Sequence, residues 1–161
     1  MRTIILLAIG IFVALIVYVR LAPNDAGTVH VQAQVRGPGD YPSADGFIAV
    51  RQITAAPSDV LKVITQAAMD TDRTTVLAGT VDDGMITFVT RSKVVGFPDY
   101  TTVSIIPAET DGLDNAGPLL MINARLRYGK SDMGVNKRRV QSWLSALGPL
   151  AVSLEQGTPS T

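Results

Sequence analysis

The chain has 161 residues, a formal net charge of zero and no cysteine. This length allows one domain, and the lack of cysteine excludes disulfides, iron–sulfur clusters and cysteine-based zinc sites. Because fourteen acids balance fourteen bases, no overall field favours nucleic acid. The single histidine, His30, excludes catalytic schemes that need two. We therefore expect no nucleic-acid partner and no cofactor.

An uncharged apolar run opens the chain between Thr3 and Val19. As a helix rising about 1.5 Å per residue, and with the apolar residues just beyond it, the run spans roughly 28–30 Å, the thickness of a bilayer's hydrocarbon core. Tyr18, near the end of the run, and Arg20, just after it, lie where an interfacial aromatic and a snorkelling cation belong. These features predict a single-pass membrane anchor over residues 1–22.

A cleaved signal peptide is the alternative to this anchor. Its apolar region is usually about 7–15 residues and precedes small residues at the cleavage site. Here the run is longer, and the sequence that follows, residues 20–23, is a poor site. Arg2 and Arg20 nearly balance across the membrane, but a very short N-terminal tail fits a signal-anchor. We expect the domain on the periplasmic or extracytoplasmic side.

The rest of the chain divides by composition. Residues 23–46 carry four glycines and three prolines with little periodicity, which predicts a linker. The ordered domain is expected over residues 47–148, long enough for one modest core. The polar segment 149–161 is predicted to be a disordered tail.

Within the domain, the spacing of hydrophobic residues changes between the period of a strand and that of a helix. Strands are predicted at 47–53, 74–81, 85–92, 100–106 and 119–128, and helices at about 58–69 and 133–147. The turn at 82–84 joins two of the strands as a hairpin. The order β-α-β-β-β-β-α predicts an α+β sandwich, with an antiparallel sheet and two helices on one face.

The last strand and helix have the clearest patterns. The strand alternates, with an apolar face made of Leu120, Ile122, Ala124, Leu126 and Tyr128. Ser131 or Asp132 can cap the helix that follows. The helix is expected to bury a stripe formed by Met133, Val140, Trp143, Leu144 and Leu147.

Two segments, 90–100 and 124–144, together resemble the bacterial domain-of-unknown-function family numbered 1499. The lead-in at 18–23 is similar to that of membrane-anchored members. The resemblance covers roughly residues 45–147 and implies the domain boundaries and the anchor, but no activity. The strand and helix order also resembles the scaffold of TATA-binding-like and helix-grip domains, some of which hold apolar ligands between sheet and helix.

Basic side chains alternate along two predicted strands. Arg91, Arg125 and Arg127 would lie on polar strand faces, and Lys130 follows the second strand. Such a patch can bind phosphate or carboxylate, although solvated surface charges give the same pattern. Asn136 lies on the apolar stripe of the last helix and should point inward, as a structural amide or as a ligand contact. These five residues form the predicted ligand site, without catalytic or metal-binding residues.

A phosphate-loop pattern at residues 124–131 lacks its first glycine and sits in an alternating strand, so we interpret it as a strand end, a turn and a helix cap. The sequence therefore favours a membrane-anchored envelope protein whose domain is a non-catalytic binding or structural module. The expected partners are the membrane bilayer and an anionic lipid or an envelope protein. Two alternatives are an enzyme that uses the basic cluster on an anionic substrate, and a carrier of an apolar ligand between sheet and helix.

Overall fold

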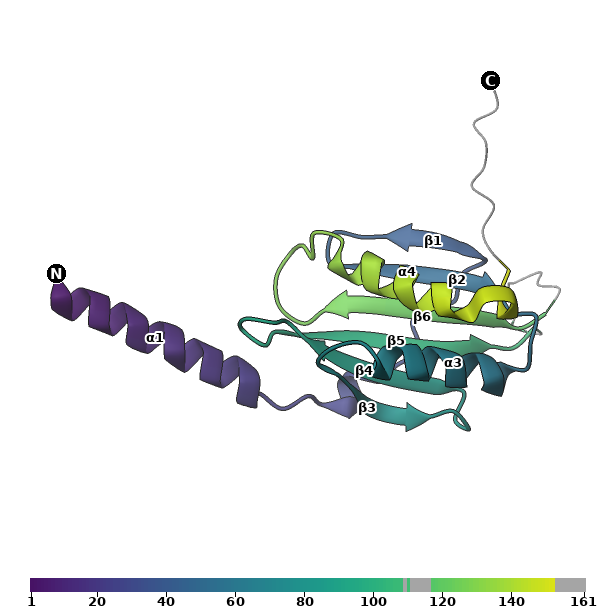
Figure 1. Ribbon diagram of the computed structural model, residues 1–161, viewed down its shortest axis with the longest axis horizontal. Helices are drawn as coiled ribbons and strands as arrows, with labels where there is room; N and C mark the ends of the chain where they lie inside the picture. Colours follow the sequence, from purple (N-terminus) through teal and green to yellow (C-terminus); the bar gives the residue numbers. More distant parts are fainter. Residues whose placement is uncertain (109, 111–116, 153–161) are drawn as a thin grey trace, which may run out of the picture.

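Six antiparallel strands form one sheet in the order β1-β2-β6-β5-β4-β3 (Figure 1). The computed structural model describes residues 1–108, 110 and 117–152. The elements in chain order are α1 (Arg2–Leu21), α2 (Ala26–Val29), β1 (Gly39–Pro42), β2 (Gly46–Gln52), α3 (Pro57–Met69), β3 (Thr74–Thr80), β4 (Met85–Arg91), β5 (Pro98–Ile106), β6 (Leu119–Leu126), α4 (Val135–Leu147) and the 3-10 turn η1 (Gly148–Leu150).

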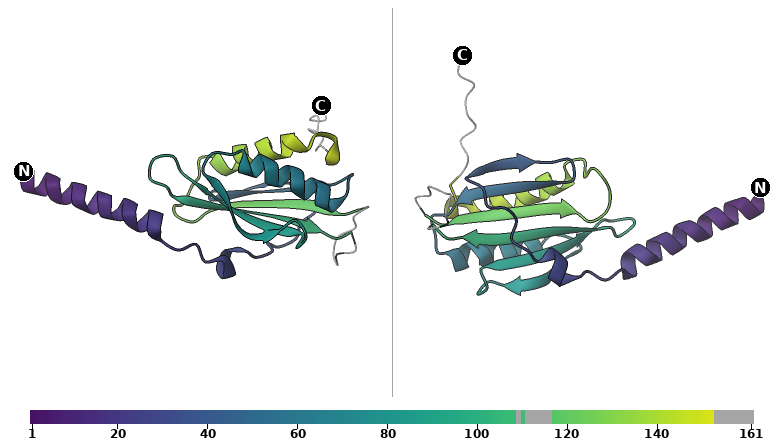
Figure 2. Two further views of the ribbon diagram at one scale, coloured as in Figure 1. Left: turned by 60° about the horizontal axis from the view of Figure 1, so that its bottom comes forward. Right: turned by 180° about the vertical axis from the view of Figure 1, so that it is seen from behind.

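The helices α3 and α4 cover one face of the sheet, here called the helix face (Figure 2, left). Between them and the strands lies the main core, whose largest fully buried side chains include Phe47, Phe88 and Trp143. The rings of Phe88 and Trp143 meet edge to face at 5.5 Å, a favoured aromatic geometry. The indole N–H of Trp143 donates to Thr71 Oγ1 at 2.8 Å, so the buried ring keeps its polar atom satisfied. The fold is α+β, as predicted.

Residues 23–38, here called the strap, cross the opposite face of the sheet (Figure 2, right). The strap contains α2, and it continues into β1, which pairs with β2 at the sheet edge. Ala33 and Val35 of the strap pack on a small second cluster that contains Val50 and Met121. The composition of residues 23–46 had predicted a linker; the structure shows part of this segment bound to the sheet as an additional strand.

Helix α1 extends away from the sheet (Figure 1). Among the described residues it is the one helix long and apolar enough to cross a membrane. Only 6% of its most apolar 18-residue stretch is buried. Membrane anchors and signal sequences both contain such a helix. Its last turn differs from the rest, because Val19 is only 3% exposed whereas Leu15 is 50% exposed. Protein therefore covers one side of the end of α1, while Leu21 on the last turn is 77% exposed.

Three local predictions differ from the structure. Met133 is 85% exposed, so its assignment to the buried stripe was wrong. Met133 and Gly134 have positive φ angles of 50° and 75°, which turn the chain before the helix. Helix α4 therefore begins only at Val135. The helix predicted at about 58–69 is α3, which begins one residue earlier, at Pro57. In the segment predicted as a disordered tail, Ala151 pairs with Ile53, while 153–161 lie outside the described residues.

Candidate functional site

The predicted arginine cluster lies on the face that the strap covers. Arg125 and Arg127 are two residues apart in the chain, at the end of β6, and extend to the same side. Arg91 ends β4, which is separated from β6 by β5. The structure therefore brings Arg125 and Arg127 together and places Arg91 two strands away, at the same end of the sheet.

Both arginines of the β6 end bind the strap. The Arg125 guanidinium donates to the backbone carbonyl of Val29 and to Thr102 Oγ1, the latter at 3.2 Å. Arg127 donates to Asn24 Oδ1 at 3.0 Å. That amide oxygen also accepts from the Tyr100 hydroxyl at 2.9 Å. These side chains thus fix the strap to the sheet, a structural use that the sequence pattern had not indicated.

The remaining predicted site residues lie apart from this contact. Arg91 donates to the carbonyl of Gly96 at 3.0 Å and so closes the β4–β5 loop. Lys130 is exposed beyond the end of β6. Asn136 is fully buried on the helix face, as its place on the α4 stripe predicted. The five residues do not form one site.

Asn136 belongs to a buried polar group at the start of α4. Its Oδ1 accepts from Arg139, which also donates to the Asp99 carboxylate at 3.0 Å. Asp132 accepts from the backbone N–H groups of Gly134 and Asn136, each at 2.8 Å. The N-cap position itself is Gly134, so Asp132 supports the helix start from two residues ahead of the cap. Burial raises the pKa of Asp99, while the Arg139 contact opposes this rise and the charge of Asp132 adds to it. This network stabilises the helix start, and Asn136 Nδ2 has no partner among the described residues.

A second polar row holds the middle of the strap. His30 Nδ1 lies 2.9 Å from Thr87 Oγ1, which in turn lies 3.0 Å from Thr102 Oγ1. Thr102 also accepts from Arg125, so the histidine and the arginine share one chain of hydrogen bonds across three strands. The only histidine therefore has a structural partner. Within the described residues no three His, Asp or Glu side chains gather as a metal site would require.

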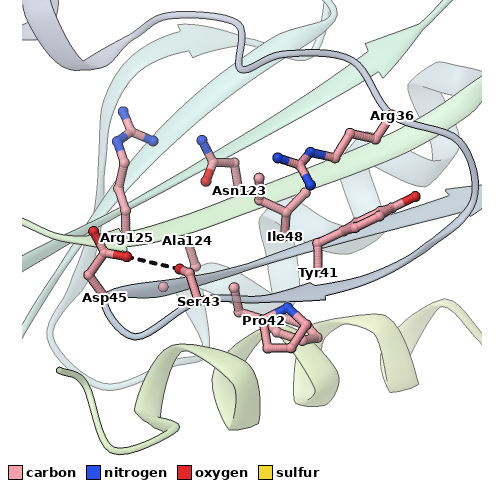
Figure 3. A pocket seen from close by; sticks show the side chains of 11 residues that line it. Arg36, Tyr41, Pro42, Ser43, Asp45, Ile48, Asn123, Ala124 and Arg125 are labelled. Carbon is pink, nitrogen blue, oxygen red and sulfur yellow. Dashed lines mark hydrogen bonds between the residues drawn. The ribbon is translucent and has the colours of Figure 1, made fainter.

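Beside this row the strap and the β1–β2 turn border an open hollow of about 270 Å³ (Figure 3). Gly46 pairs with Arg125 across the strands, and no side chain fills its place. A Cβ there would lie 2.3 Å from the carbonyl oxygen of Ala124, so the close strand approach requires glycine. The lining residues are Arg36, Tyr41, Pro42, Ser43, Asp45, Gly46, Phe47, Ile48, Asn123, Ala124 and Arg125.

Three nitrogen-bearing groups extend to one side of the strands at this hollow: Arg36, Asn123 and Arg125 (Figure 3). The Arg36 guanidinium lies over the Tyr41 ring, 4.9 Å from its centroid. Neither Arg36 nor Asn123 makes a side-chain hydrogen bond within the described part of the chain, and Arg125 uses only two of its nitrogens. Burial lowers the pKa of Arg125, and no ion pair within residues 1–108, 110 and 117–152 neutralises its charge.

This arrangement can accept an anion. Guanidinium and amide N–H groups are the donors that carboxylate and phosphate oxygens use in proteins. Ser43 and Asp45 of the β1–β2 turn also line the hollow, and the serine hydroxyl donates to the carboxylate at 2.9 Å. Both are exposed in a tight turn, so this pair lacks the desolvated surroundings that activate a nucleophile.

Sequence reasoning found Arg125 but missed Arg36 and Asn123. A signal for the strap was present, because Val31, Ala33 and Val35 alternate with polar residues as a strand-like segment does on a sheet. The glycines and prolines around this short stretch outweighed it. Asn123 follows the same alternation as Arg125, so the predicted strand already placed both on one face.

A comparison with the curated proteins finds no match. A family model described as a protein of unknown function, DUF1499, matches residues 18–147. The match includes the strap, the whole sheet and both helices of the helix face. It confirms the resemblance seen in the sequence and extends it towards the N-terminus. The chain belongs to the DUF1499 family.

Proposed function

We propose that this protein is a single-pass membrane protein that carries a non-catalytic, anion-binding DUF1499 domain on the extracytoplasmic side of a bacterial envelope. The anchor is supported by the length of α1, by its exposed apolar side chains and by the poor cleavage site that follows. Its end bears the cation Arg20, as expected at a membrane surface.

Anchoring is tested by carbonate extraction of membranes and by intact mass of the mature chain. We expect the protein to stay with the membrane and to retain residues 1–22, whereas an N-terminus beyond Ala22 would contradict the anchor. Because the chain has no cysteine, Lys62→Cys gives a single label site on an exposed helix. An impermeant maleimide should label it in intact spheroplasts if the domain is extracytoplasmic, and only after lysis if it is not.

The binding role rests on one observation: the half-buried guanidinium of Arg125 stands beside the unpartnered Arg36 and Asn123 around a hollow. A partly desolvated cation without a carboxylate partner is unfavourable, and an anion in the hollow would supply the missing charge. The hollow is slightly below the usual range for drug-sized ligands. A small carboxylate or phosphate fits this chemistry best.

The experiment compares binding of inorganic phosphate and of acetate by the detergent-solubilised full chain, using calorimetry or amide chemical shifts. Arg36→Gln removes a cation that makes no hydrogen bond to the described protein, so folding should be unaffected. Arg138→Gln is the matched control on the exposed surface of α4. We expect Arg36→Gln to weaken binding about tenfold or more and the control to leave it unchanged, in line with a charge-assisted hydrogen bond. Equal affinities of wild type and Arg36→Gln would refute the site.

An enzyme acting on an anionic substrate is the alternative that uses the same donors. It would need a general base near the hollow, and Asp45 is the group in reach of Ser43. Turnover of phosphate or carboxylate esters that is lost in Asp45→Asn would favour this alternative. The apolar-carrier alternative gains no support from the packing, since aromatic and aliphatic side chains fill the space between the sheet and the helices.

A further inference from the structure

We propose that the end of the domain nearest α1 rests on the bilayer and contacts anionic phospholipid headgroups through two loops, residues 92–97 and 129–134. These loops are here called the seat. The inference rests on the membrane anchor proposed above and goes beyond it, because a tethered domain can also hang free in solution. Both loops project towards the side of the domain where α1 emerges (Figure 1).

The end of α1 is bound to the first of these loops. Arg20 donates from Nε to the carbonyl of Val95 and from a terminal nitrogen to the carbonyl of Val94, each at 3.3 Å. Gly96 has a φ of +84°, and a Cβ there would lie 3.1 Å from Cγ of Arg20. Glycine therefore lets the arginine stem lie against the loop. Because Arg20 marks the membrane surface, residues 92–97 lie at the same level as the headgroups.

The side chains of the seat suit a membrane surface better than water. Val94 is 77% exposed and Met133 is 85% exposed, although both are apolar. Lys93 and Lys130 are exposed close to them in the chain. Apolar side chains can enter the interface while lysines keep their charge at the phosphates, as in proteins that lie on membranes.

The two loops are joined into one surface. The rings of Phe97 and Tyr128 lie 6.0 Å apart, and the Arg127 guanidinium lies 5.1 Å from the centre of the Tyr128 ring. Arg127 in turn binds Asn24, just beyond the end of α1. The anchor, the strap and the first loop are therefore linked through Arg127 and Tyr128, and the second loop follows Tyr128 directly in the chain. The seat thus keeps its place relative to the anchor.

Charges near the seat and at the far end of the sheet differ in sign. Several acids near the seat are engaged within the protein: Asp99 pairs with Arg139, and Asp132 accepts two backbone N–H groups. Asp72 pairs with Arg73, and Asp45 accepts from the Ser43 hydroxyl. At the opposite end, the β3–β4 turn carries Asp82 and Asp83, which are followed by a glycine and have no adjacent base. An anionic surface attracts the first end and repels the second, which would orient the domain.

The test uses the full chain in lipid nanodiscs, with single cysteines that carry an environment-sensitive fluorophore. Val94→Cys and Met133→Cys report from the seat, and Asp83→Cys is the matched reporter at the far end. In nanodiscs that contain anionic lipid, we expect blue-shifted emission and quenching by nitroxide-labelled lipid at 94 and 133 only. Equal, weak quenching at all three positions would overturn the inference, as would a blue shift at the seat without lipid quenching.

A second comparison separates charge from mere proximity. Lys93→Gln combined with Lys130→Gln should reduce quenching at Met133→Cys at least twofold in anionic nanodiscs, towards the value in neutral ones. Lys62→Gln, whose lysine forms an exposed pair with Asp59 on α3, should change nothing. If quenching at Met133→Cys in the double variant still differs between anionic and neutral nanodiscs as in wild type, the role of the lysines would be overturned.

The two proposals fail in distinguishable ways. Carbonate extraction is done first on every variant. A chain released from membranes would refute both the anchor and the seat. A chain that is retained but shows no quenching at 94 and 133 would refute the seat and leave the anchor standing.

Discussion

The two faces of the sheet are covered by different means. On the helix face, α3 and α4 bury a continuous apolar core around Trp143. On the strap face, an irregular segment is held largely by side-chain hydrogen bonds from Arg125, Arg127, His30 and Tyr100. Burial of apolar area is non-directional and collective, whereas each of these hydrogen bonds depends on one geometry.

This difference shows that a row of arginines on a strand does not by itself mark a ligand site. Arg125 and Arg127 use their donors on the strap, and Arg91 uses one on a neighbouring loop. Donors that make no hydrogen bond within the described part of the chain lie beside the gap that the strap leaves, at the exposed Arg36 and the half-buried Asn123. A binding site on this face therefore lies where the strap leaves part of the sheet uncovered.

The largest effect is expected on the helix face. Trp143→Ala should destabilise the domain by about 3–5 kcal/mol, because it leaves a large cavity beneath α4 and removes the contact with Phe88. Denaturant unfolding of the detergent-solubilised chain measures this change. An unchanged midpoint would mean that the helix face is not the main source of stability.

A smaller loss is expected at the start of α4. Asp132→Ala should lower the free energy of unfolding by about 2 kcal/mol, since two backbone N–H groups lose their acceptor. Asp132→Asn, which keeps one acceptor oxygen, should recover part of the loss. Ser131→Ala is the control, because its hydroxyl accepts from Met133 at only 3.4 Å. Equal losses from Ser131→Ala and Asp132→Ala would contradict this role of Asp132 at the helix start.

On the strap face, Asn24→Ala should cost about 1 kcal/mol, because Tyr100 and Arg127 lose a shared acceptor but can still reach water. The neighbouring polar substitution Gln32→Ala, in an exposed part of the strap, should leave the unfolding curve unchanged. A loss as large as that of Trp143→Ala would show that the two faces are not held differently.

The smallest expected effect is a pH dependence at Asp99. Burial raises the pKa of this carboxyl in the folded state, so the folded state binds its proton more tightly than the unfolded state does. Its contribution to stability is therefore present at acid pH and is lost as pH rises through the raised pKa. The stability of wild type relative to Asp99→Asn should fall as pH rises above about 4, the ordinary pKa of an aspartate in the unfolded chain. A rise over this range would mean that the Arg139 pair outweighs burial.

The sequence predicted the helix face well because its signals are periodic. The alternation along β6 and the stripe Val140, Trp143 and Leu147 follow from the repeats of strand and helix. Met133 was misplaced because Met133 and Gly134, just before α4, have left-handed backbone conformations that break the helical repeat. The spacing of apolar residues in the sequence does not show these conformations. The loop between β5 and β6 and the final segment were also predicted, but most of both lies outside the described residues.

The strap face could be predicted only in part. The pattern placed Arg125 and Arg127 on one face, but a partner distant in sequence, Asn24 or Val29, leaves no local signal. The hollow depends on where the strap stops touching the sheet, and on the missing side chain of Gly46. Such features follow from tertiary contacts, which a single sequence does not show.

Arg125 and Arg127 at the end of β6 hold the strap to the sheet, and hydrogen exchange of the strap is the sharpest test of this claim. In wild type, the N–H of His30 is bound to the carbonyl of Ala26, within a four-residue helix that is too short to persist alone. Arg125→Gln combined with Arg127→Gln should speed exchange in peptides covering 26–30 at least tenfold, while peptides from α4 stay protected. The control pair Lys93→Gln and Lys130→Gln should leave the strap unchanged. Equally fast exchange of 26–30 in wild type and in the arginine variant would contradict the claim.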